Sequence, residues 1–460
     1  MTQLQNNETA RGLRFQNSHM AVRWHKLAGD EQELITCADF KVRAALVGRV
    51  GLIELSCGTG AWRVRDAMNT VANALGMKLS ADIGLTTIEY TCFDPEGLYS
   101  AELSIKSTGV NTDKLTSMEK FVDWFAQAAG AAPENMAKAP VPTVGEVHSR
   151  LDDIEHMKGN YTAFQAGLAA GVACAAFTFL LGGGWVEIVG ALFGAGVGNY
   201  VRRKMLDRHL TLVFCLMCGV SAACLTYLGV FSLLQYLLHL SSAHEAGYIG
   251  SMLFVIPGFP LITSGLDLAK QDMRSGLERL GHALMIIIVS TMVGWLVAYY
   301  VKLAPQDFVP LKLTAEQLFL LRLPASFFGV FGFSVMFNSP VPMAATAGLI
   351  GMFTNTLRLE LVDLCGMPGA AAAFMNALMS GLIASGIHRK LHWPRTALTV
   401  PSIVIMVPGL YMYRAVYNLG IGAFTEGGTW LTKAILMVIC MPMGLIVARV
   451  CTDSRFRHCD

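Results

Sequence analysis

Charged residues are scarce in this chain, and neither sign of charge is in excess. Only 15% of the 460 residues are charged, whereas a soluble globular protein carries about 25%. The 35 Lys and Arg against 33 Asp and Glu leave a formal charge of +2, so no polybasic domain is present to bind nucleic acid. The 53% of hydrophobic residues excludes a disordered chain. We therefore expect a protein that is part soluble and part embedded in a lipid bilayer.

A disulfide framework is also missing. Several of the 11 cysteines lie in apolar runs, where a free thiol behaves as a small apolar residue. Cys215 and Cys218 form a CxxC pair, but no second CxxC and no paired histidine accompanies it. The sequence therefore predicts neither a metal site nor a cofactor.

The N-terminal region lacks the apolar segment of a signal peptide. Residues 1–34 carry charges throughout and are predicted to be a flexible tail. The first long apolar stretch begins only near Tyr161. We therefore expect the first 160 residues or so to lie in the cytosol.

Residues 35–130 are predicted to form a compact α+β domain. Apolar spacing predicts helices over 38–54, 62–75 and 117–129, with Gly76 ending the second. Three strand-like runs, 78–83, 86–92 and 99–106, include a hairpin around the turn at 94–97. Residues 131–160 then read as an Ala/Pro-rich linker and an amphipathic helix over 143–157, where Thr143 and Glu146 fit a capping box.

This domain lacks the residues that nucleotide binding or hydrolysis needs. The loop 56–60, with Gly58 and Gly60, has neither phosphate-loop spacing and lies between two predicted helices. Ser56 and Cys57 are available nucleophiles, but residues 38–129 contain no histidine to serve as their base.

Ten hydrophobic segments follow, each close to the roughly 20 residues that span a bilayer. The predicted fold is thus a polytopic α-helical membrane protein with an N-terminal soluble α+β domain. Its domains are a first membrane module over 161–303, a second over 304–450 and a cytosolic tail over 451–460. Pro340 and Pro342 indicate a broken or re-entrant start of the seventh span. The predicted spans are 161–182, 184–201, 210–231, 248–267, 280–302, 317–337, 342–357, 367–387, 398–418 and 429–450.

We expect the chain to span the plasma membrane. The cations in the short loops predict that both termini face the cytosol. The outer loops then hold few cations, chiefly Lys302 and Lys312. The inner loops and tail hold Arg202, Arg203, Lys204, Arg208, Lys270, Arg274, Arg279, Arg389, Lys390, Arg395, Arg455 and Arg457.

A repeated motif divides the membrane region into two sets of five spans. Pro257-Gly258 and Pro408-Gly409 each fall about half-way along the fourth span of a set. A Gly/Ala-rich span that ends in a basic residue, Arg202 or Arg358, precedes each motif. Five is odd, so the two sets would be inserted in opposite orientations. Inverted repeats with interrupted helices are typical of secondary transporters. The alternative is an ordinary proline kink in each span.

Polar residues at membrane depth are the remaining candidates for transport. Arg414 lies beyond Pro408-Gly409 and suits a carboxylate. Asp267 and Glu187 either serve transport or are solvated at an interface. The amides Asn338, Asn355 and Asn376 either contact substrate or bond neighbouring helices.

The chain resembles the threonine/serine exporter family over about residues 38–450. The resemblance rests on motifs in the family's order. They are Gly60-Ala61-Trp62-Arg63-Val64 with Ala67, Ala74-Leu75-Gly76, Gly109-Val110-Asn111, Thr143-Val144-Gly145-Glu146 with Leu151 and Ile154, Pro257-Gly258 with Asp267-Leu268, Gly276-Leu277 and Arg279, and Val407-Pro408-Gly409-Leu410 with Tyr413 and Arg414. One position departs: Arg65 stands where the family tends to have an acidic residue.

The resemblance implies export of threonine and serine, driven by protons, by a protein that is not an enzyme. The candidates for transport are Pro257, Gly258, Asp267, Asn338, Asn355, Pro408, Gly409, Tyr413 and Arg414, of which Asn338 and Asn355 rest on the residue pattern alone. Asp267 is the candidate for proton coupling or for binding the ammonium group of the substrate. Gly58, Gly60 and Arg63 are a motif of the soluble domain. Relatives with separate membrane modules suggest a dicarboxylate such as succinate as an alternative. A membrane-anchored enzyme or sensor acting through residues 35–130 is a third hypothesis. A homo-oligomer is compatible with the sequence.

Overall fold

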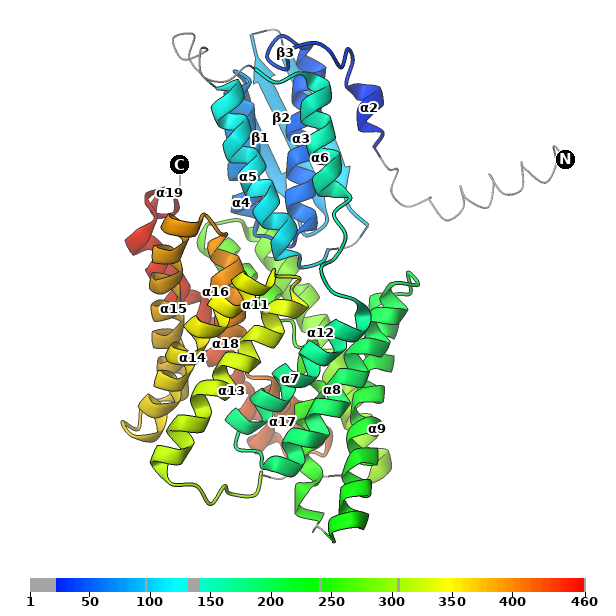
Figure 1. Cartoon of the computed structure of the whole chain (residues 1–460), viewed down its shortest axis with the longest axis vertical. Helices are drawn as coiled ribbons and strands as arrows, with labels where there is room; N and C mark the ends of the chain where they lie inside the picture. The colour runs from blue at the N-terminus through cyan, green and yellow to red at the C-terminus, as the bar shows by residue number, and fades with distance from the viewer. Residues whose placement is uncertain are drawn as a thin grey trace, which may run out of the picture. The chain divides into compact units, whose positions relative to one another are not determined.

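The computed structural model describes residues 22–95, 97–106, 108–130, 141–239, 242–303 and 307–458. Most of the expected tail and the linker residues 131–140 lie outside these ranges. The chain divides into two compact units (Figure 1). Unit 1 comprises Met1–Lys158 with Asp272–Glu278, and unit 2 comprises Gly159–Gln271 with Arg279–Asp460.

Unit 1 is a three-stranded antiparallel sheet with helices. Strands β1 (Lys78–Ile83), β2 (Thr87–Asp94) and β3 (Gly97–Ser104) follow one another in the order β1-β2-β3. Alternate residues of β2, Ile88, Tyr90 and Cys92, are buried against the helices. The helices are α2 (Trp24–Leu27), α3 (Phe40–Ser56), α4 (Ala61–Ala74), α5 (Thr112–Ala129) and α6 (Val144–Glu155).

The caps of the helices explain where they begin and end. Helix α5 begins five residues before its predicted start because the Asn111 side chain accepts a hydrogen bond from the Lys114 amide. Thr143 caps α6 in the same way, at 3.2 Å from the Glu146 amide. The Glu146 side chain pairs with Arg150 at 3.0 Å, and α4 ends before Gly76, whose φ is +73°.

The first residues of helix α12 (Met273–Val301) belong to unit 1. Arg274 pairs with Asp82 at 2.6 Å and with Glu89 at 2.8 Å, both on the sheet. Arg65, the residue that departs from the family pattern, pairs with Asp272 at 2.5 Å. Arginine at position 65 therefore supplies a cation that pairs with the Asp272 carboxylate, just before α12.

Unit 2 consists of helices over its described residues, and six of these helices are long and apolar enough to cross a membrane. Two bent pairs of helices raise that number to eight if each pair is one span. The helices are α7 (Ala163–Leu180), α8 (Trp185–Leu206), α9 (Leu212–Leu238), η2 (Ser242–Gly247), α10 (Tyr248–Met252), η3 (Leu253–Val255), α11 (Gly258–Ala269), α12, α13 (Ala315–Met336), α14 (Val341–Asp363), α15 (Gly369–Leu391), α16 (Arg395–Val404), α17 (Gly409–Gly420), α18 (Phe424–Thr452) and α19 (Ser454–Arg457). The chain therefore has the architecture of a polytopic membrane protein.

Helices lie where all ten spans were predicted, but α8 and α14 are not among the six. Both are rich in glycine and alanine, and both bury their small residues against neighbouring helices. The prediction of a broken start of α14 was wrong. Pro340 is its N-cap and Pro342 lies in its first turn, where a proline removes only an amide that has no helical partner.

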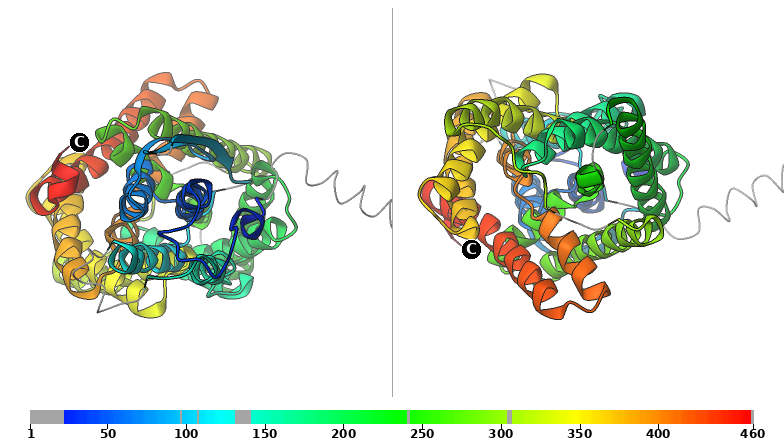
Figure 2. Two further views of the ribbon diagram at one scale, coloured as in Figure 1. Left: turned by 90° about the horizontal axis from the view of Figure 1, so that it is seen from above. Right: turned by 90° about the horizontal axis from the view of Figure 1, so that it is seen from below.

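Corresponding helices of the two predicted modules have corresponding neighbours. Helix α7 packs on α8 as α13 packs on α14, and α10 packs on α8 as α16 packs on α14. Helices α7 and α13 join the two sets by packing on each other. Figure 2 views these helices nearly end-on, with α7, α8 and α9 in teal and green and α15 and α18 in orange and red.

Candidate functional site

Unit 2 contains two bends of the same geometry. The first lies between η3 and α11 (50°) and the second between α16 and α17 (49°). The backbone angles are φ −81° and ψ 60° at Pro257, and φ −78° and ψ 55° at Pro408. At each bend the following glycine amide donates to the carbonyl two residues earlier, at 2.8 and 2.7 Å. Each bend is therefore an inverse γ-turn centred on proline.

The two bends contact each other. A β-carbon on Gly258 would overlap the Cγ2 atom of Val404, in the helix before the second bend. A β-carbon on Gly409 would overlap the Cδ1 atom of Ile256, beside the first bend. The structure thus brings the two predicted breaks face to face, and aliphatic side chains fill the contact.

Tyr413 lies one turn beyond this contact. Its hydroxyl is 2.6 Å from the hydroxyl of Tyr248 on α10, and both side chains are buried. The tyrosine pair therefore adds a polar link between the two bent segments.

The two acidic candidates are buried, so the interpretation that they are solvated was wrong. Asp267 is 0% exposed and lies 3.1 Å from the Nε atom of Arg279. Glu187 is 1% exposed and lies 2.7 Å from His244. Burial of a carboxylate with a basic partner is what a low-dielectric interior requires.

The amide candidates bond neighbouring segments. Asn338, at the end of α13, has φ 63° and accepts a 2.7 Å hydrogen bond from the Asn160 amide. Asn376 donates to the sulfur of Met406 at 2.9 Å. Asn355 donates to Ser326 at 2.9 Å and accepts from the Nε atom of Arg358 at 2.9 Å. Asn355 thereby positions an arginine that faces a cavity.

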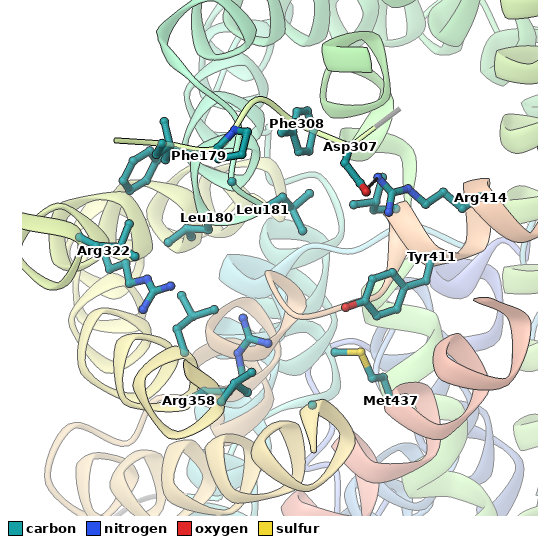
Figure 3. A pocket seen from close by; sticks show the side chains of 18 of the residues that line it. Phe179, Leu180, Leu181, Asp307, Phe308, Arg322, Arg358, Tyr411, Arg414 and Met437 are labelled. Carbon is teal, nitrogen blue, oxygen red and sulfur yellow. Dashed lines mark hydrogen bonds and ion pairs between the residues drawn. The ribbon is translucent and has the colours of Figure 1, made fainter. Parts of the chain in front are cut away.

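That cavity, the arginine pocket, has a volume of about 560 Å³ (Figure 3). The end of α7, the loop 307–313, and helices α13, α14, α17 and α18 line it. Figure 3 shows the guanidinium groups of Arg322 and Arg358 and the hydroxyl of Tyr411 directed into the same space. Its volume lies within the range of small-molecule sites. Its polar lining residues are Asp307, Arg322, Arg358, Tyr411 and Arg414.

The three arginines of the pocket differ in how far their charge is balanced. Arg322 pairs with Glu360 at 2.7 Å and with Asp363. Arg414 pairs with Asp307 at 2.8 Å and lies over the ring of Trp430. Arg358 has a neutral amide as its partner, and no ion pair joins it to a carboxylate of the described residues. A carboxylate ligand would supply the missing charge.

The Asn355–Arg358 pair has a counterpart at the corresponding place of α8. Arg202 donates to the Oδ1 atom of Asn199 at 2.9 Å, three residues earlier, as Arg358 does to Asn355. Both amide nitrogens donate to the preceding helix, α7 or α13. The two halves of unit 2 therefore share a side-chain network as well as a bend.

The soluble-domain motif forms a compact corner of unit 1. Gly58 has φ +81°, and a β-carbon there would overlap the carbonyl oxygen of Gly109. Gly60 is the N-cap of α4, and Arg63 pairs with Glu119. Burial raises the pKa of the nearby Glu54 to about 7, against the opposing charge of Arg63. Burial raises the pKa of the Cys57 thiol as well, so this corner carries no activated nucleophile.

The sequence pointed to Arg414 but missed Arg322 and Tyr411 as pocket residues. Arg358 was noted only as the cation that ends a small-residue span. Its spacing from Asn355, repeated at Asn199 and Arg202, was the available signal. Among the described residues, no group of three His, Cys, Asp or Glu could hold a metal ion.

Two family models match the chain. One, described as "Putative threonine/serine exporter", matches residues 45–301. The other, described as "Threonine/Serine exporter, ThrE", matches residues 322–451. Together they cover most of unit 1 and unit 2.

Curated relatives are similar to the chain at low identity. A "Probable threonine/serine exporter" of Mycobacterium tuberculosis is 23% identical over 87% of this chain and 74% of its own length. A "Probable succinate transporter subunit YjjP" of Escherichia coli is 26% identical over 54% of this chain and 90% of its own length. The protein of that name from Klebsiella aerogenes is also 26% identical, over 54% and 89%. No solved structure matches the chain.

Proposed function

The chain belongs to the threonine/serine exporter family. We propose that it exports threonine and serine across the plasma membrane in exchange for protons. The family is one of transporters, so the chain is not an enzyme. The finer points of the proposal are ten spans in a 5+5 inverted repeat, both termini in the cytosol, and a soluble domain over 35–130. The two matching bends and the two Asn–Arg pairs support the repeat.

Arg358 in the arginine pocket is the observation that carries the proposal. Its guanidinium faces a cavity large enough for an amino acid, and its partner is a neutral amide. We assign the substrate carboxylate to Arg358 and Arg414, because a planar guanidinium binds a carboxylate through two parallel hydrogen bonds. Asp307 and the Tyr411 hydroxyl are acceptors for the ammonium and hydroxyl groups of the substrate.

The bends and the buried polar pairs would transmit motion around this pocket. Tyr411, Tyr413 and Arg414 all follow Pro408-Gly409 on α17, so a change at that bend moves the pocket wall. Pro257, Gly258 and Tyr248 lie against it from the other half. We propose that Asn338 and the Asp267–Arg279 pair hold the ends of α13 and α11 during this movement.

The test is transport by the full chain in proteoliposomes loaded with labelled threonine. An outward substrate gradient with an inward proton gradient should give efflux that serine reduces by competition and lysine does not. If neither threonine nor serine leaves the proteoliposomes faster than it leaves protein-free liposomes, the proposal is contradicted. In intact cells, loading with a Thr-Thr dipeptide should raise external threonine only when the protein is present.

A dicarboxylate is the second candidate because the pocket holds three arginines and two similar proteins are named as succinate transporter subunits. If succinate is the substrate, labelled succinate leaves the liposomes and threonine does not compete. The same preparation therefore distinguishes the two candidates.

A further inference from the structure

A buried acid–base pair lies beside the arginine pocket. Glu187, in the first turn of α8, is 1% exposed. Its Oε1 atom is 2.7 Å from the Nδ1 atom of His244, whose side chain is 18% exposed. Its Oε2 atom is buried without a hydrogen-bond partner among the described residues. One oxygen of the carboxyl group is therefore available to carry a proton.

Tyr227 and three glycines are neighbours of this pair among the described residues. From α9, the Tyr227 hydroxyl donates a 2.6 Å hydrogen bond to the backbone oxygen of His244. A β-carbon on Gly247 would lie 2.8 Å from Glu187 Cγ and 2.6 Å from Tyr227 Cζ, so that glycine makes room for both. Gly183 and Gly184 also adjoin the Glu187 side chain, and Leu311 adjoins Gly184. His244 is thus the basic partner of Glu187 within the described residues.

The pair shares a wall with the arginine pocket. A β-carbon on Gly184 would lie 3.1 Å from the Oε2 atom of Glu187 and 3.9 Å from the Cδ2 atom of Leu311. Leu311 lines the pocket, as does Gly182 two residues before Gly184. Movement of the 307–313 loop around a substrate would therefore change the surroundings of the Glu187 carboxyl group.

The chemistry of the pair suits a proton that binds and leaves. A buried carboxylate costs more free energy than the neutral acid, so a proton on that oxygen lowers the cost. His244 is the more exposed partner, so it connects the acid to water. Asp267 differs, because Arg279 is permanently charged and their ion pair persists without a bound proton.

We propose that Glu187 and His244 form the proton-binding site that couples transport to the proton gradient. The inference rests on the proposed function, since it names the coupling site of that transporter. The proton is taken from water on one side of the membrane and released to water on the other. Only O–H and N–H bonds form and break.

Two transport modes of Glu187→Gln in proteoliposomes test this proposal. Exchange of labelled for unlabelled threonine (or succinate, if wild type moves that) needs no net proton movement, whereas efflux driven by a pH gradient does. We expect the exchange rate of the variant to lie within about threefold of the wild-type rate. Its gradient-driven efflux should be at least tenfold slower than that of wild type. Asp267→Asn, the matched removal of a buried charge, should not separate the two modes.

Gradient-driven efflux by Glu187→Gln at a rate within about twofold of wild type would overturn the proposal. Loss of exchange and of efflux together in a variant that elutes as a folded protein would overturn it too, because that result makes the pair structural. A wild type that moves neither threonine nor succinate would instead refute the proposed function.

Infrared spectroscopy adds a readout of protonation that does not depend on transport. Infrared difference spectra on addition of the substrate that wild type moves should show the carbonyl stretch of a protonated carboxyl group. That band should be absent from Glu187→Gln and shifted in His244→Asn. A band that survives unchanged in Glu187→Gln would assign the proton to another residue.

Discussion

At the scale of single residues, the substrate role that we propose for Arg358 draws on both the sequence and the structure. The sequence showed a cation after a run of small residues, and the structure places it in a cavity beside two better-balanced arginines. Burial and hydrogen-bond partners decide such a role, and neither can be read from a single position in the chain.

Replacing Arg358 by Gln should weaken substrate binding while leaving the fold intact. Loss of a hydrogen bond to a charged group costs roughly 1.5–3 kcal/mol, so KM for efflux should rise roughly 10- to 100-fold. Arg358→Lys should recover only part of this loss because lysine lacks the planar fork. Lys312→Gln removes an exposed cation of the adjacent loop and is the matched control. An unchanged KM in Arg358→Gln would remove this residue from the site.

Glu54 should make unit 1 less stable as the pH rises. Burial raises its pKa to about 7 in the folded chain from 4.5, so the folded state holds the proton more tightly than the unfolded state. The contribution of Glu54 to stability is fully present below about pH 4.5 and is lost as the pH rises through about 7. The loss amounts to at most about 3 kcal/mol. Glu54→Gln should remove this loss.

Hydrogen exchange of α3 in the full chain measures the effect of Glu54. At pH 8, exchange in Glu54→Gln should be slower than in wild type, by up to about a hundredfold, and at pH 4.5 the two should agree. Glu102→Gln, an exposed position on β3, should match wild type at both. Burial beside Arg49 lowers the pKa of His148 to about 4, so the contribution of His148 to stability rises between about pH 4 and 6.5. Because the variant and the wild type are compared at the same pH, this contribution is the same in both. Equal exchange of Glu54→Gln and wild type at pH 8 would contradict the argument.

At the scale of helices, the hydrophobic pattern predicted the position of every long helix of unit 2. It could not predict the exact starts, because caps such as Asn111 and Pro340 depend on local hydrogen bonds. It also could not show that the two bends meet, since that contact joins residues about 150 positions apart. The arginine pocket lies beyond the second bend, around Tyr411 and Arg414.

The contact between the bends predicts a compensating pair of substitutions. Gly258→Ala places a β-carbon on Val404 Cγ2, and valine has little freedom at χ1. Overpacking of this kind costs about 1–3 kcal/mol, so we expect a lower thermal midpoint and slower transport. Val404→Ala in the same chain should restore both.

A glycine in open space provides the control for this substitution. Gly386→Ala on α15 meets no atom within 4 Å and should behave as wild type. Failure of Val404→Ala to rescue Gly258→Ala, with coupling near zero in the double-mutant cycle, would mean that the two bends do not pack in the working protein.

At the scale of the whole molecule, the distribution of charged and apolar residues along the chain predicted a soluble region followed by a membrane region. The departure at Arg65 gained a meaning only with the structure, because its partner Asp272 is 207 positions away. Long-range pairs of this kind leave no periodic signal in one sequence.

The cysteines of the chain can establish its orientation in the membrane. Cys37 and Cys365 are both exposed in the structure, and the loop cations predict them on opposite sides. In variants that keep one cysteine each, a membrane-impermeant maleimide added to intact cells should label Cys365. Cys37 should react only after the cells are permeabilised. The reverse pattern would place the termini outside.

The aliphatic contact between the two proline turns has a consequence for how the family can vary. Each glycine is matched to a branched side chain that belongs to the opposite half, Gly258 to Val404 and Gly409 to Ile256. A larger residue at one turn is therefore tolerated only with a smaller one across the contact. Among related chains we expect these positions to change in step, so that the record of natural substitution reports which residues touch at the centre of the transporter.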